Sequence, residues 1–458
     1  MKTNTPFSAD LDEVINLFLP AGQADAEHHC ENKGDFYENA VRIGEKRYVY
    51  AYPADGETAL EIKRAFKYGA KLAVYRAFSA YTGKRMPWGA LTGIRPSKLA
   101  YRELETRGEF RTLFDEMDVS APKRELIEKI VEEQRGIYDT DPANGDFFVF
   151  IPFCPSKCRY CSFITADITR SGQYVPAYID ALAEEIAAAK PLVKKLRSVY
   201  IGGGTPVALP PEELERVLAA VGDAGGAEYT VEAGRPDCIT AEKIALLEKY
   251  GVTRVCVNPQ TFCDDTLARL GRKHTAADVY EKYALVKDKF SVNMDLIAGL
   301  EGETPEIFAR SVDAAIALRP DNITVHTLCL KSGAALKEET AYLSGEGVSA
   351  MVEYAHRALA DAGYAPYYLY RQKYMAGNLE NTGYTLPGKA CVYNVDTMEE
   401  LCDNVACGAN AISKAVFGGG ARIERYKNPK DIPTYLAKKD AIIAKKAELF
   451  SPKGKKNA

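Results

Sequence analysis

Hydrophobic and polar residues follow two different rhythms along this chain. In the first part, residues 36–54 alternate in the manner of a β-hairpin whose turn is IGEK. Residues 57–83 have apolar positions at helical spacing, and two further helical patterns follow. A polar segment with proline and glycine, DTDPANGD at 139–146, then resembles a linker. We therefore predict an N-terminal accessory α/β domain over residues 1–145.

After the linker, short β-branched or aromatic runs alternate regularly with helical segments. Six such units within about 180 residues predict a parallel sheet with right-handed crossovers. The runs are largely apolar, as expected for strands covered on both faces. Because a complete barrel of this kind has eight strands, we expect a partial (β/α)6 barrel over residues 146–334. The predicted strands are 147–151, 198–203, 228–234, 254–260, 291–297 and 322–328.

The regular pattern ends near residue 335. The following segment is rich in Tyr, Asn and Gly, and a helical pattern is predicted near residues 396–417. We interpret residues 335–458 as a C-terminal α+β domain that covers the mouth of the barrel. The last residues, SPKGKKNA, are expected to be a solvated basic tail.

Composition narrows the classes of partner. The net charge of the 458 residues is −4, which gives no electrostatic reason to expect nucleic acid. No apolar run reaches the ~20 residues that span a bilayer, and the N-terminal stretch lacks the apolar core of a signal peptide. We therefore expect a cytoplasmic protein without a membrane partner. In that compartment most of the 11 cysteines stay reduced, so a cluster of cysteines indicates metal binding or catalysis.

Polar or unusual residues follow all six predicted strands at their carboxyl ends. This is the end of a βα barrel at which active sites are built. In chain order they are the cysteines of IPFCPSKCRYCSF, the GGGTP stretch, Glu232, Gln260, Asp295 and His326.

Cys154, Cys158 and Cys161 have the spacing C-x3-C-x2-C. A structural zinc site closes its shell with four ligands, and the nearest further candidates, Cys238 and His274, belong to other parts of the predicted barrel. A dithiol redox site uses one C-x2-C pair and would leave Cys154 spare. A 4Fe–4S cluster fits better, because three protein ligands leave one iron open to bind another molecule.

The cysteine spacing, together with the six-unit barrel, resembles the signature of the radical S-adenosylmethionine (SAM) superfamily. The resemblance implies that the open iron chelates the amino and carboxylate groups of SAM. It also implies that the backbone of the GGGTP stretch approaches the amino-acid part of SAM, an approach that glycine permits. Glu232 resembles the acidic residue that takes the ribose hydroxyls, and Tyr160 is placed to pack beside the adenine. The cofactor-binding residues implied are Tyr160, Gly203, Gly204, Thr205, Glu232, Gln260, Arg272 and Asp295.

The stretches IPFCPSKCRYCSF, YIGGGTP, NPQTF and MDLIAGL together resemble the oxygen-independent coproporphyrinogen III dehydrogenase (oxidase) family. The resemblance covers about residues 146–425 and is greatest for a branch with a long N-terminal extension. It implies a radical SAM oxidoreductase of heme biosynthesis that converts two propionates of coproporphyrinogen III to vinyls. It further implies a one-electron reductant of flavodoxin or ferredoxin type. Since the substrate carries four carboxylates, we expect Arg235, His326, Arg371 and Lys373 to contact it.

Three alternatives remain open. The related heme chaperones carry H-N-x-x-Y-W after a PG-x-x-C element, whereas PGKACVYNVDTM has Tyr393 at the histidine position. A radical SAM enzyme acting on another tetrapyrrole is the second alternative, and a non-enzymatic iron–sulfur or tetrapyrrole sensor is the third. The sequence also has Phe148 where the well-characterised members of the family have tyrosine, and Ser162 follows the last cysteine where they have a further cysteine.

Overall fold

The computed structural model describes residues 1–19, 25–93, 95–163, 165–329, 345–372, 375–420 and 422–451. The chain forms two compact units. Unit 1 comprises Met1–Glu128 and Arg371–Glu380, and unit 2 comprises Lys129–Tyr370 and Asn381–Ala458. The predicted domain boundaries at 145/146 and 334/335 stay predictions. Along the chain, the boundaries between the two compact units fall at other positions, 128/129, 370/371 and 380/381.

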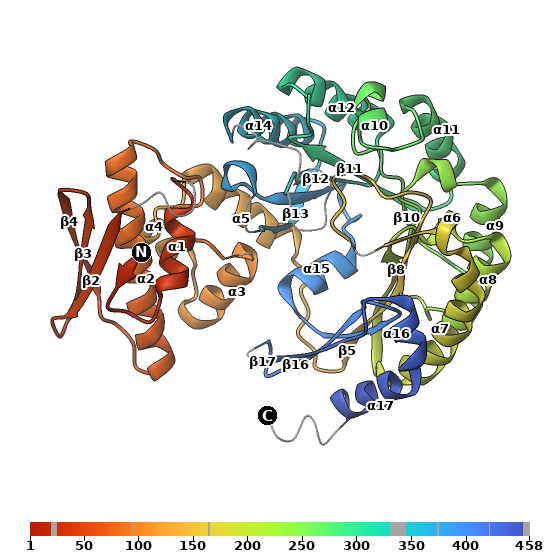
Figure 1. The fold of residues 1–458 in the computed structure, drawn as a ribbon, viewed down its shortest axis with the longest axis horizontal. Helices are drawn as coiled ribbons and strands as arrows, with labels where there is room; N and C mark the ends of the chain where they lie inside the picture. The colour runs from red at the N-terminus through yellow and green to blue at the C-terminus, as the bar shows by residue number, and fades with distance from the viewer. Residues whose placement is uncertain are drawn as a thin grey trace. The chain divides into compact units, whose positions relative to one another are not determined.

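Unit 1 is a four-stranded sheet with helices against it (Figure 1). The strand order is β1-β2-β3-β4, with β1 and β2 parallel and the other neighbours antiparallel. The long helix α2 packs on β3 and β4. Its elements are β1 (Lys2–Thr3), α1 (Ser8–Ile15), β2 (Ala26–Asn32), β3 (Phe36–Ile43), β4 (Lys46–Pro53), α2 (Ala59–Thr82), α3 (Pro96–Arg107), α4 (Arg111–Glu116) and the first part of α5 (Ala121–Glu133).

Two sequence predictions for unit 1 are confirmed. The predicted hairpin is β3 and β4, which pair up to Ile43 opposite Lys46 around the expected turn. The predicted long helix is α2, which begins with a capping box between Thr58 and Glu61. It ends at Gly83, whose φ of 71° is the left-handed conformation that glycine adopts without strain.

Unit 2 is built on one eleven-stranded sheet in the order β13-β14-β12-β11-β10-β9-β8-β5-β15-β16-β17. The seven strands from β12 to β15 run parallel, and antiparallel strands extend both edges. The strands are β5 (Asn144–Ile151), β8 (Lys195–Gly203), β9 (Glu228–Glu232), β10 (Arg254–Cys256), β11 (Ser291–Ala298), β12 (Asn322–Thr327), β13 (Ala365–Tyr370), β14 (Asn381–Thr385), β15 (Asp403–Cys407), β16 (Ile412–Phe417) and β17 (Arg422–Lys427). A separate two-stranded ladder joins β6 (Phe153–Cys154) and β7 (Ala166–Asp167).

Helices follow the outer side of this curved sheet, whereas one helix, α15, lies on its inner side (Figure 1). Helix α15 contacts both β8 and β13, which are far apart in the strand order. The helices are α6 (Ile168–Ser171), α7 (Val175–Ala189), α8 (Pro211–Val221), α9 (Ala241–Lys249), α10 (Asp264–Arg269), α11 (Ala276–Val286), α12 (Pro305–Leu318), α14 (Gly345–Asp361), α15 (Val392–Glu399), α16 (Ile432–Ala437) and α17 (Lys439–Leu449).

The predicted α/β class with a partial barrel is confirmed. All six predicted strands are present, as β5, β8, β9, β10, β11 and β12, and they lie next to one another in that order. The ends of the sheet, β13 and β17, are not paired with each other among the residues that the structure describes, so the barrel is open.

The helix predicted over residues 396–417 is wrong for most of its length. Helix α15 ends at Glu399, because Glu400 has a φ of 56° and closes it in the left-handed conformation. The remaining residues form β15 and β16. Strand β15 adds a seventh parallel strand beside β5, and it packs there because its residues from Asn404 to Cys407 are buried.

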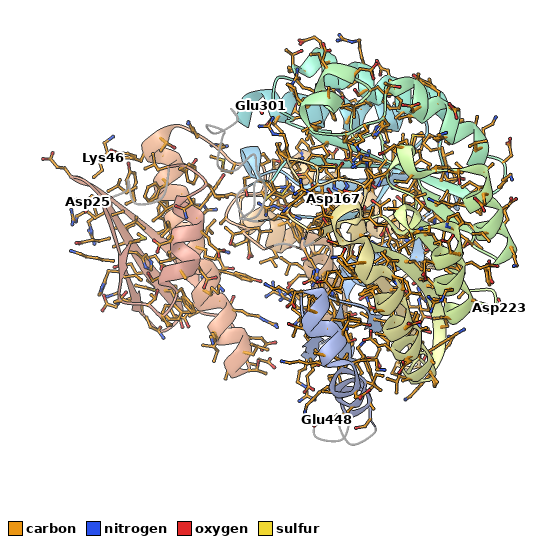
Figure 2. The ribbon with its side chains drawn as sticks, turned by 45° about the vertical axis from the view of Figure 1, so that its right-hand side comes forward. Asp25, Lys46, Asp167, Asp223, Glu301 and Glu448 are labelled. Atoms are coloured by element: carbon orange, nitrogen blue, oxygen red, sulfur yellow. The ribbon has the colours of Figure 1, made fainter. Side chains whose placement is uncertain are left out.

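Charged side chains of both signs are spread over each unit (Figure 2). Asp25 and Lys46 are exposed on unit 1, and Asp223, Glu301 and Glu448 are exposed on unit 2. No described helix combines the length and the apolar character needed to span a membrane.

Candidate functional site

The three cysteines lie in the segment that follows the carboxyl end of β5. Cys154 is in β6, and the backbone N–H of Cys161 donates to the carbonyl of Cys158 at 3.0 Å, which closes a turn between them. The segment is held against the end of α10, because Arg159 N–H donates to the Leu270 carbonyl at 3.1 Å. The sequence separation of the cysteines is thus converted into one compact loop.

The three thiols have different surroundings. Cys154 Sγ lies 3.5 Å from Thr205 Oγ1, and burial raises the pKa of this thiol. Burial also raises the pKa of Cys161, to about 11. Cys158 Sγ is buried and faces two guanidinium groups, Arg235 Nη1 at 3.5 Å and Arg272 Nη1 at 3.8 Å. A bound metal deprotonates thiols outright, so burial alone does not prevent these from serving as ligands.

The spread of the thiols suits a cluster better than a single ion. A tetrahedral zinc site with bonds near 2.3 Å places its sulfur atoms about 3.8 Å apart. Among the described residues, only Asp146, Asp396 and Cys402 bring three potential ligand atoms within 4.8 Å of one another. At least two of the three thiols of the loop are therefore more than 4.8 Å apart, which is wider than a lone zinc ion requires.

The Gly202–Gly204 edge of β8 runs beside both the cysteine loop and Glu232. A Cβ atom on Gly204 would lie 2.6 Å from the Phe153 carbonyl oxygen and 3.1 Å from Cys154 Sγ. A Cβ atom on Gly202 would lie 2.9 Å from the carboxyl carbon of Glu232. At Gly204 the atoms that meet a Cβ are largely backbone, so glycine is needed for this close approach. At Gly202 a Cβ would instead displace the side chains of Tyr200 and Glu232.

Replacing Gly204 by alanine is expected to displace the cysteine loop, because the atoms that meet the new Cβ belong largely to the backbone. Such overpacking costs about 1–3 kcal/mol, so we expect iron retention to fall roughly tenfold. Iron per chain after anaerobic reconstitution and desalting measures it. Gly172→Ala is the matched control, since no atom lies within 4 Å of the position that its Cβ would take and it should keep wild-type iron. Full iron retention in Gly204→Ala would show that this edge does not constrain the loop.

Glu232 is the last residue of β9 and Asp295 lies within β11, and these two strands are separated only by β10. Tyr200 OH donates to Glu232 Oε1 at 2.6 Å, and burial raises the pKa of Glu232 to about 7. Asn293 Nδ2 donates to Asp295 Oδ1 at 2.8 Å. Burial alone would raise the pKa of Asp295, but hydrogen bonds from His326 and Asn293 lower it. The two carboxyl groups therefore differ in character: Glu232 is partly neutral near pH 7, and Asp295 is ionised.

His326 connects Asp295 to the next strand. Its Nε2 lies 3.7 Å from Asp295 Oδ1, and its Nδ1 lies 3.4 Å from the hydroxyl of Tyr370. The predicted His326 is therefore part of a polar row at this end of the sheet.

Gln260 has a φ of 70°, which is unusual for a residue other than glycine. Its N–H donates to the carbonyl of Asp295 at 2.9 Å, and the side chain is buried. A backbone held in this conformation costs about 1–3 kcal/mol, and such residues cluster at functional sites.

Tyr160 and Arg272 complete the predicted set. Tyr160 packs against an apolar cluster made of Leu270, Ile297, Leu300 and Leu328. Arg272 Nη1 donates to the Tyr160 hydroxyl at 3.0 Å. An apolar wall beside a phenol is suited to a flat aromatic ring such as adenine.

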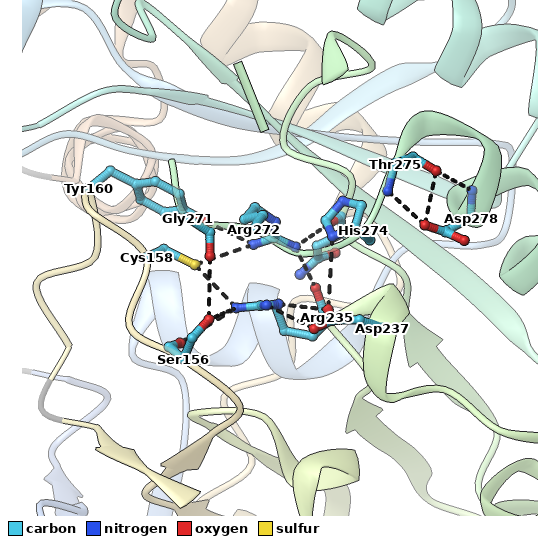
Figure 3. A network of polar contacts seen from close by, with 12 residues as sticks. Ser156, Cys158, Tyr160, Arg235, Asp237, Gly271, Arg272, His274, Thr275 and Asp278 are labelled. Carbon is cyan, nitrogen blue, oxygen red and sulfur yellow. Dashed lines mark hydrogen bonds and ion pairs between the residues drawn. The ribbon is translucent and has the colours of Figure 1, made fainter. Parts of the chain in front are cut away.

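Figure 3 shows the polar network beside Cys158, with Arg272 above and Arg235 below on its right and with His274 and Asp237 farther to the right. Arg235 forms two hydrogen bonds of 2.9 Å with the carboxylate of Asp237. His274 Nδ1 lies 3.9 Å from Asp237, and burial lowers the pKa of His274 to about 4, so the imidazole is neutral.

Of the four residues predicted to contact substrate, the three that the structure describes have different surroundings, unlike the residues predicted to bind the cofactors, which lie together. Arg235 is buried and all its nitrogens are engaged by Asp237 and by the cysteine loop, which favours a structural role over a contact with substrate. Arg371 belongs to unit 1, where it donates to the Leu91 carbonyl at 2.7 Å and its Cζ lies 5.1 Å from the centre of the Trp88 ring. Lys373 lies outside the described residues. His326 lies near the carboxyl end of β12, where its side chain faces Asp295.

The sequence analysis missed Tyr200, and it noted Phe148 and Tyr393 only as departures from related families without expecting them to contact one another. Tyr393 of α15 stacks on Tyr200 with ring centres 4.4 Å apart, and Phe148 stacks on both at 6.0 Å. These three rings form an aromatic layer beneath Glu232. The alternation of strand residues places Tyr200 on the same face as Gly202 and could have identified it. No signal in the sequence pairs Tyr393 with it.

Comparison with known proteins identifies the chemistry to which this site belongs. Residues 148–315 match the Radical SAM superfamily. The oxygen-independent coproporphyrinogen-III oxidase-like protein HemZ of Bacillus subtilis is 34% identical over 446 residues, which cover 93% of this chain and 87% of that protein. The heme chaperone HemW of Lactococcus lactis is 30% identical, over 67% of this chain and 79% of that protein.

A solved structure has a similar fold. It is the coproporphyrinogen III oxidase HemN from Escherichia coli, described as a radical SAM enzyme. The TM-score is 0.53 with 22% sequence identity, and the match covers 67% of this chain and 71% of that chain.

Proposed function

This chain belongs to the radical SAM family of oxygen-independent coproporphyrinogen III oxidase-like proteins and heme chaperones, and from that premise we propose that it is an oxidoreductase of porphyrin biosynthesis. The reaction proposed is the oxidative decarboxylation of two propionates of coproporphyrinogen III to vinyl groups. A flavodoxin or ferredoxin type of protein is proposed as the one-electron donor. The cofactors of the superfamily are a 4Fe–4S cluster and SAM.

The observation that carries the proposal is a continuous row of contacts at the carboxyl ends of the barrel strands. Cys154 lies beside Gly204, Gly202 lies beside Glu232, and Glu232 and Asp295 influence each other electrostatically. Three thiols, a strand end made of glycine residues and two carboxyl groups are the chemical types needed for a cluster and for the amine and hydroxyl groups of SAM. We propose that the cysteines hold the cluster, and that Glu232 binds ribose hydroxyls with Tyr200 orienting its carboxyl group.

When bound, the cluster and SAM supply a one-electron cleavage of a carbon–sulfur bond and the abstraction of a hydrogen atom from substrate. The protein supplies the positions of the binding groups. The stacked rings of Phe148, Tyr200 and Tyr393 hold Tyr200 in place, and its hydroxyl donates to Glu232 Oε1. The ionised Asp295 is oriented by Asn293 and His326, so it presents a fixed acceptor.

A heme chaperone is the second candidate, because several relatives carry that name. The position that holds histidine in the chaperone motif is Tyr393, which is 9% exposed and stacked on Tyr200. Its hydroxyl accepts from Asn404 Nδ2 at 3.3 Å. A phenol packed inside the barrel in this way is not free to bind heme iron, so this observation favours the enzyme.

The decisive experiment is an anaerobic assay of the reconstituted protein with SAM, a low-potential reductant and coproporphyrinogen III. Each propionate loses carbon dioxide, one hydrogen atom and one electron, so one 5′-deoxyadenosine is expected for each vinyl formed. Chromatography of the porphyrins, nucleosides and methionine measures the ratio. Stoichiometric heme binding without substrate-dependent 5′-deoxyadenosine would overturn the proposal and favour the chaperone.

A further inference from the structure

Cys158 differs from the other two cysteines of the loop in the charge that faces it. Cys154 Sγ is near the neutral hydroxyls of Thr205 and Thr165, whereas two guanidinium groups lie within 3.8 Å of Cys158 Sγ. Arg235 also acts electrostatically on Cys154 and Lys157 on Cys161, but the two guanidinium groups make their direct contacts with Cys158. Cys158 is also the most buried of the three, so water screens this charge least there.

Arg235 is fixed in its orientation toward the thiol. It is 3% exposed, and Asp237 accepts hydrogen bonds from its Nε and Nη2. The fork leaves Nη1 directed at the cysteine loop, where it lies 3.2 Å from Ser156 Oγ and 3.5 Å from Cys158 Sγ (Figure 3). A planar guanidinium held through two nitrogens directs its third nitrogen with little freedom.

Arg272 places a second positive charge beside Cys158, and none of its described hydrogen-bond partners is a carboxylate. Its Nη2 donates to the carbonyls of Gly234 at 3.0 Å and Asn258 at 2.7 Å. Its Nη1 faces Tyr160 OH and Cys158 Sγ, and its Nε is buried without a hydrogen-bond partner. A buried cation is costly unless an anion compensates it, and none of these described partners is a carboxylate. The charges therefore favour an anionic group at Cys158.

We propose that the Arg235–Asp237 pair sets the reduction potential of the cluster through Cys158. Arg235 is a positioning residue that donates to the ligand sulfur, and Asp237 both aims it and offsets part of its charge. Reduction adds one electron from the low-potential donor to the cluster. A donor and a positive charge at a ligand sulfur stabilise the reduced form more than the oxidised form, which raises the potential. This inference rests on the cluster site of the proposed function.

Two substitutions should shift the potential in opposite directions. Arg235→Gln removes the positive charge, so we expect the ratio of reduced to oxidised cluster at a fixed potential to fall about tenfold, or about 59 mV for one electron. Asp237→Asn removes the offsetting negative charge, so the ratio should rise. Arg235→Lys keeps the charge but loses the fork, and its decrease should be smaller than that of Arg235→Gln. If the two substitutions acted only by disturbing the packing, they would not shift the reduction potential in opposite directions.

The measurement is a redox titration of the reconstituted full chain followed by electron paramagnetic resonance, without SAM or substrate. Arg216→Gln is the matched control, because Arg216 pairs with Asp180 on the surface of unit 2 and should leave the potential unchanged. Shifts of the same sign in Arg235→Gln and Asp237→Asn, or no shift in either, overturn the inference. If Arg235→Gln does not retain iron, the directions of the potential shifts in Asp237→Asn and Arg235→Lys test the inference instead. An upward shift in the first and a downward shift in the second support it, and any other result overturns it.

This experiment separates the inference from the proposed function. A wild-type protein that holds no cluster contradicts the proposed site itself. A wild-type protein with a normal cluster, whose potential does not respond to Arg235 or Asp237, contradicts only the inference. Because neither substrate nor SAM is added, the readout is independent of turnover.

Discussion

Replacing Cys158 by alanine is expected to reduce the iron of the anaerobically reconstituted protein from about four atoms per chain to nearly none. Three thiolates hold the proposed cluster, and without Cys158 only Cys154 and Cys161 remain. The change also leaves Arg235 and Arg272 facing an apolar methyl group in a buried site. The loss of one ligand and of the anion that compensates two cations acts in the same direction. Iron and sulfide analysis, with the visible absorbance of the cluster, measures the result.

Cys238→Ala is the sharpest control for this experiment. Cys238 follows Asp237 directly and its thiol is close enough to Cys154 for the two to influence each other. Cys238 lies outside the C-x3-C-x2-C loop, and besides burial the negative charge of the neighbouring Asp237 carboxylate raises its pKa and disfavours a thiolate there. We expect this variant to keep its full iron content. Full iron in Cys158→Ala would contradict the proposed ligand set, and loss of iron in Cys238→Ala would indicate a fourth thiol ligand.

The strands of the barrel were predictable because each is a short apolar run between clear helical patterns. Strand β15 was not, since Asp403, Asn404 and Cys407 do not form an apolar run. Its place beside β5 depends on contacts between residues more than 250 positions apart, such as Asp403 opposite Gly145. Local spacing carries no information about such a partner, and the helical pattern predicted there was overruled by the sheet.

In the candidate site, too, local patterns were predictable and contacts between distant residues were not. The cysteine spacing and the residues at strand ends identified the thiols, the glycine edge, Glu232 and Asp295. The residues that adjust them could not be predicted, because Tyr393 reaches Tyr200 from a distant helix and Asp237 is defined by its pairing with Arg235. The role expected for Arg235 illustrates the limit: the sequence identifies a cation, but burial and hydrogen-bond partners determine which group it faces.

A buried ion pair between Lys446 of α17 and Glu185 of α7 holds these two helices against strand β15. Lys446 of α17 donates to Glu185 of α7 and to the carbonyl of Ala406 in β15. Glu185 also accepts from Tyr435 OH at 2.6 Å and from the Gly408 N–H at 2.8 Å. Lys446 and Glu185 are at most 1% exposed. This carboxylate therefore joins α7, α16, α17 and the end of β15, the strand that extends the barrel beside β5.

Lys446→Met is expected to lower the free energy of unfolding of unit 2 by about 3–5 kcal/mol, because it leaves the Glu185 carboxylate buried without a counter-charge. Far-UV circular dichroism during urea unfolding measures the change. The fluorescence of Trp88, the only tryptophan, reports on unit 1 instead. Lys445→Met is the control: Lys445 pairs with Glu448 at the surface, so its loss should change stability by no more than about 0.5 kcal/mol.

A second substitution tests whether the cost comes from the uncompensated charge. Adding Glu185→Gln to Lys446→Met removes that charge while keeping an amide that can hydrogen-bond to Tyr435, so the double variant should recover about 1–2 kcal/mol. Hydrogen exchange of peptides from α7 and α17 should show the loss and the recovery at these helices. If Lys446→Met costs no more than Lys445→Met, or if the double variant is the less stable of the two, the buried charge is not what holds α17 against the sheet.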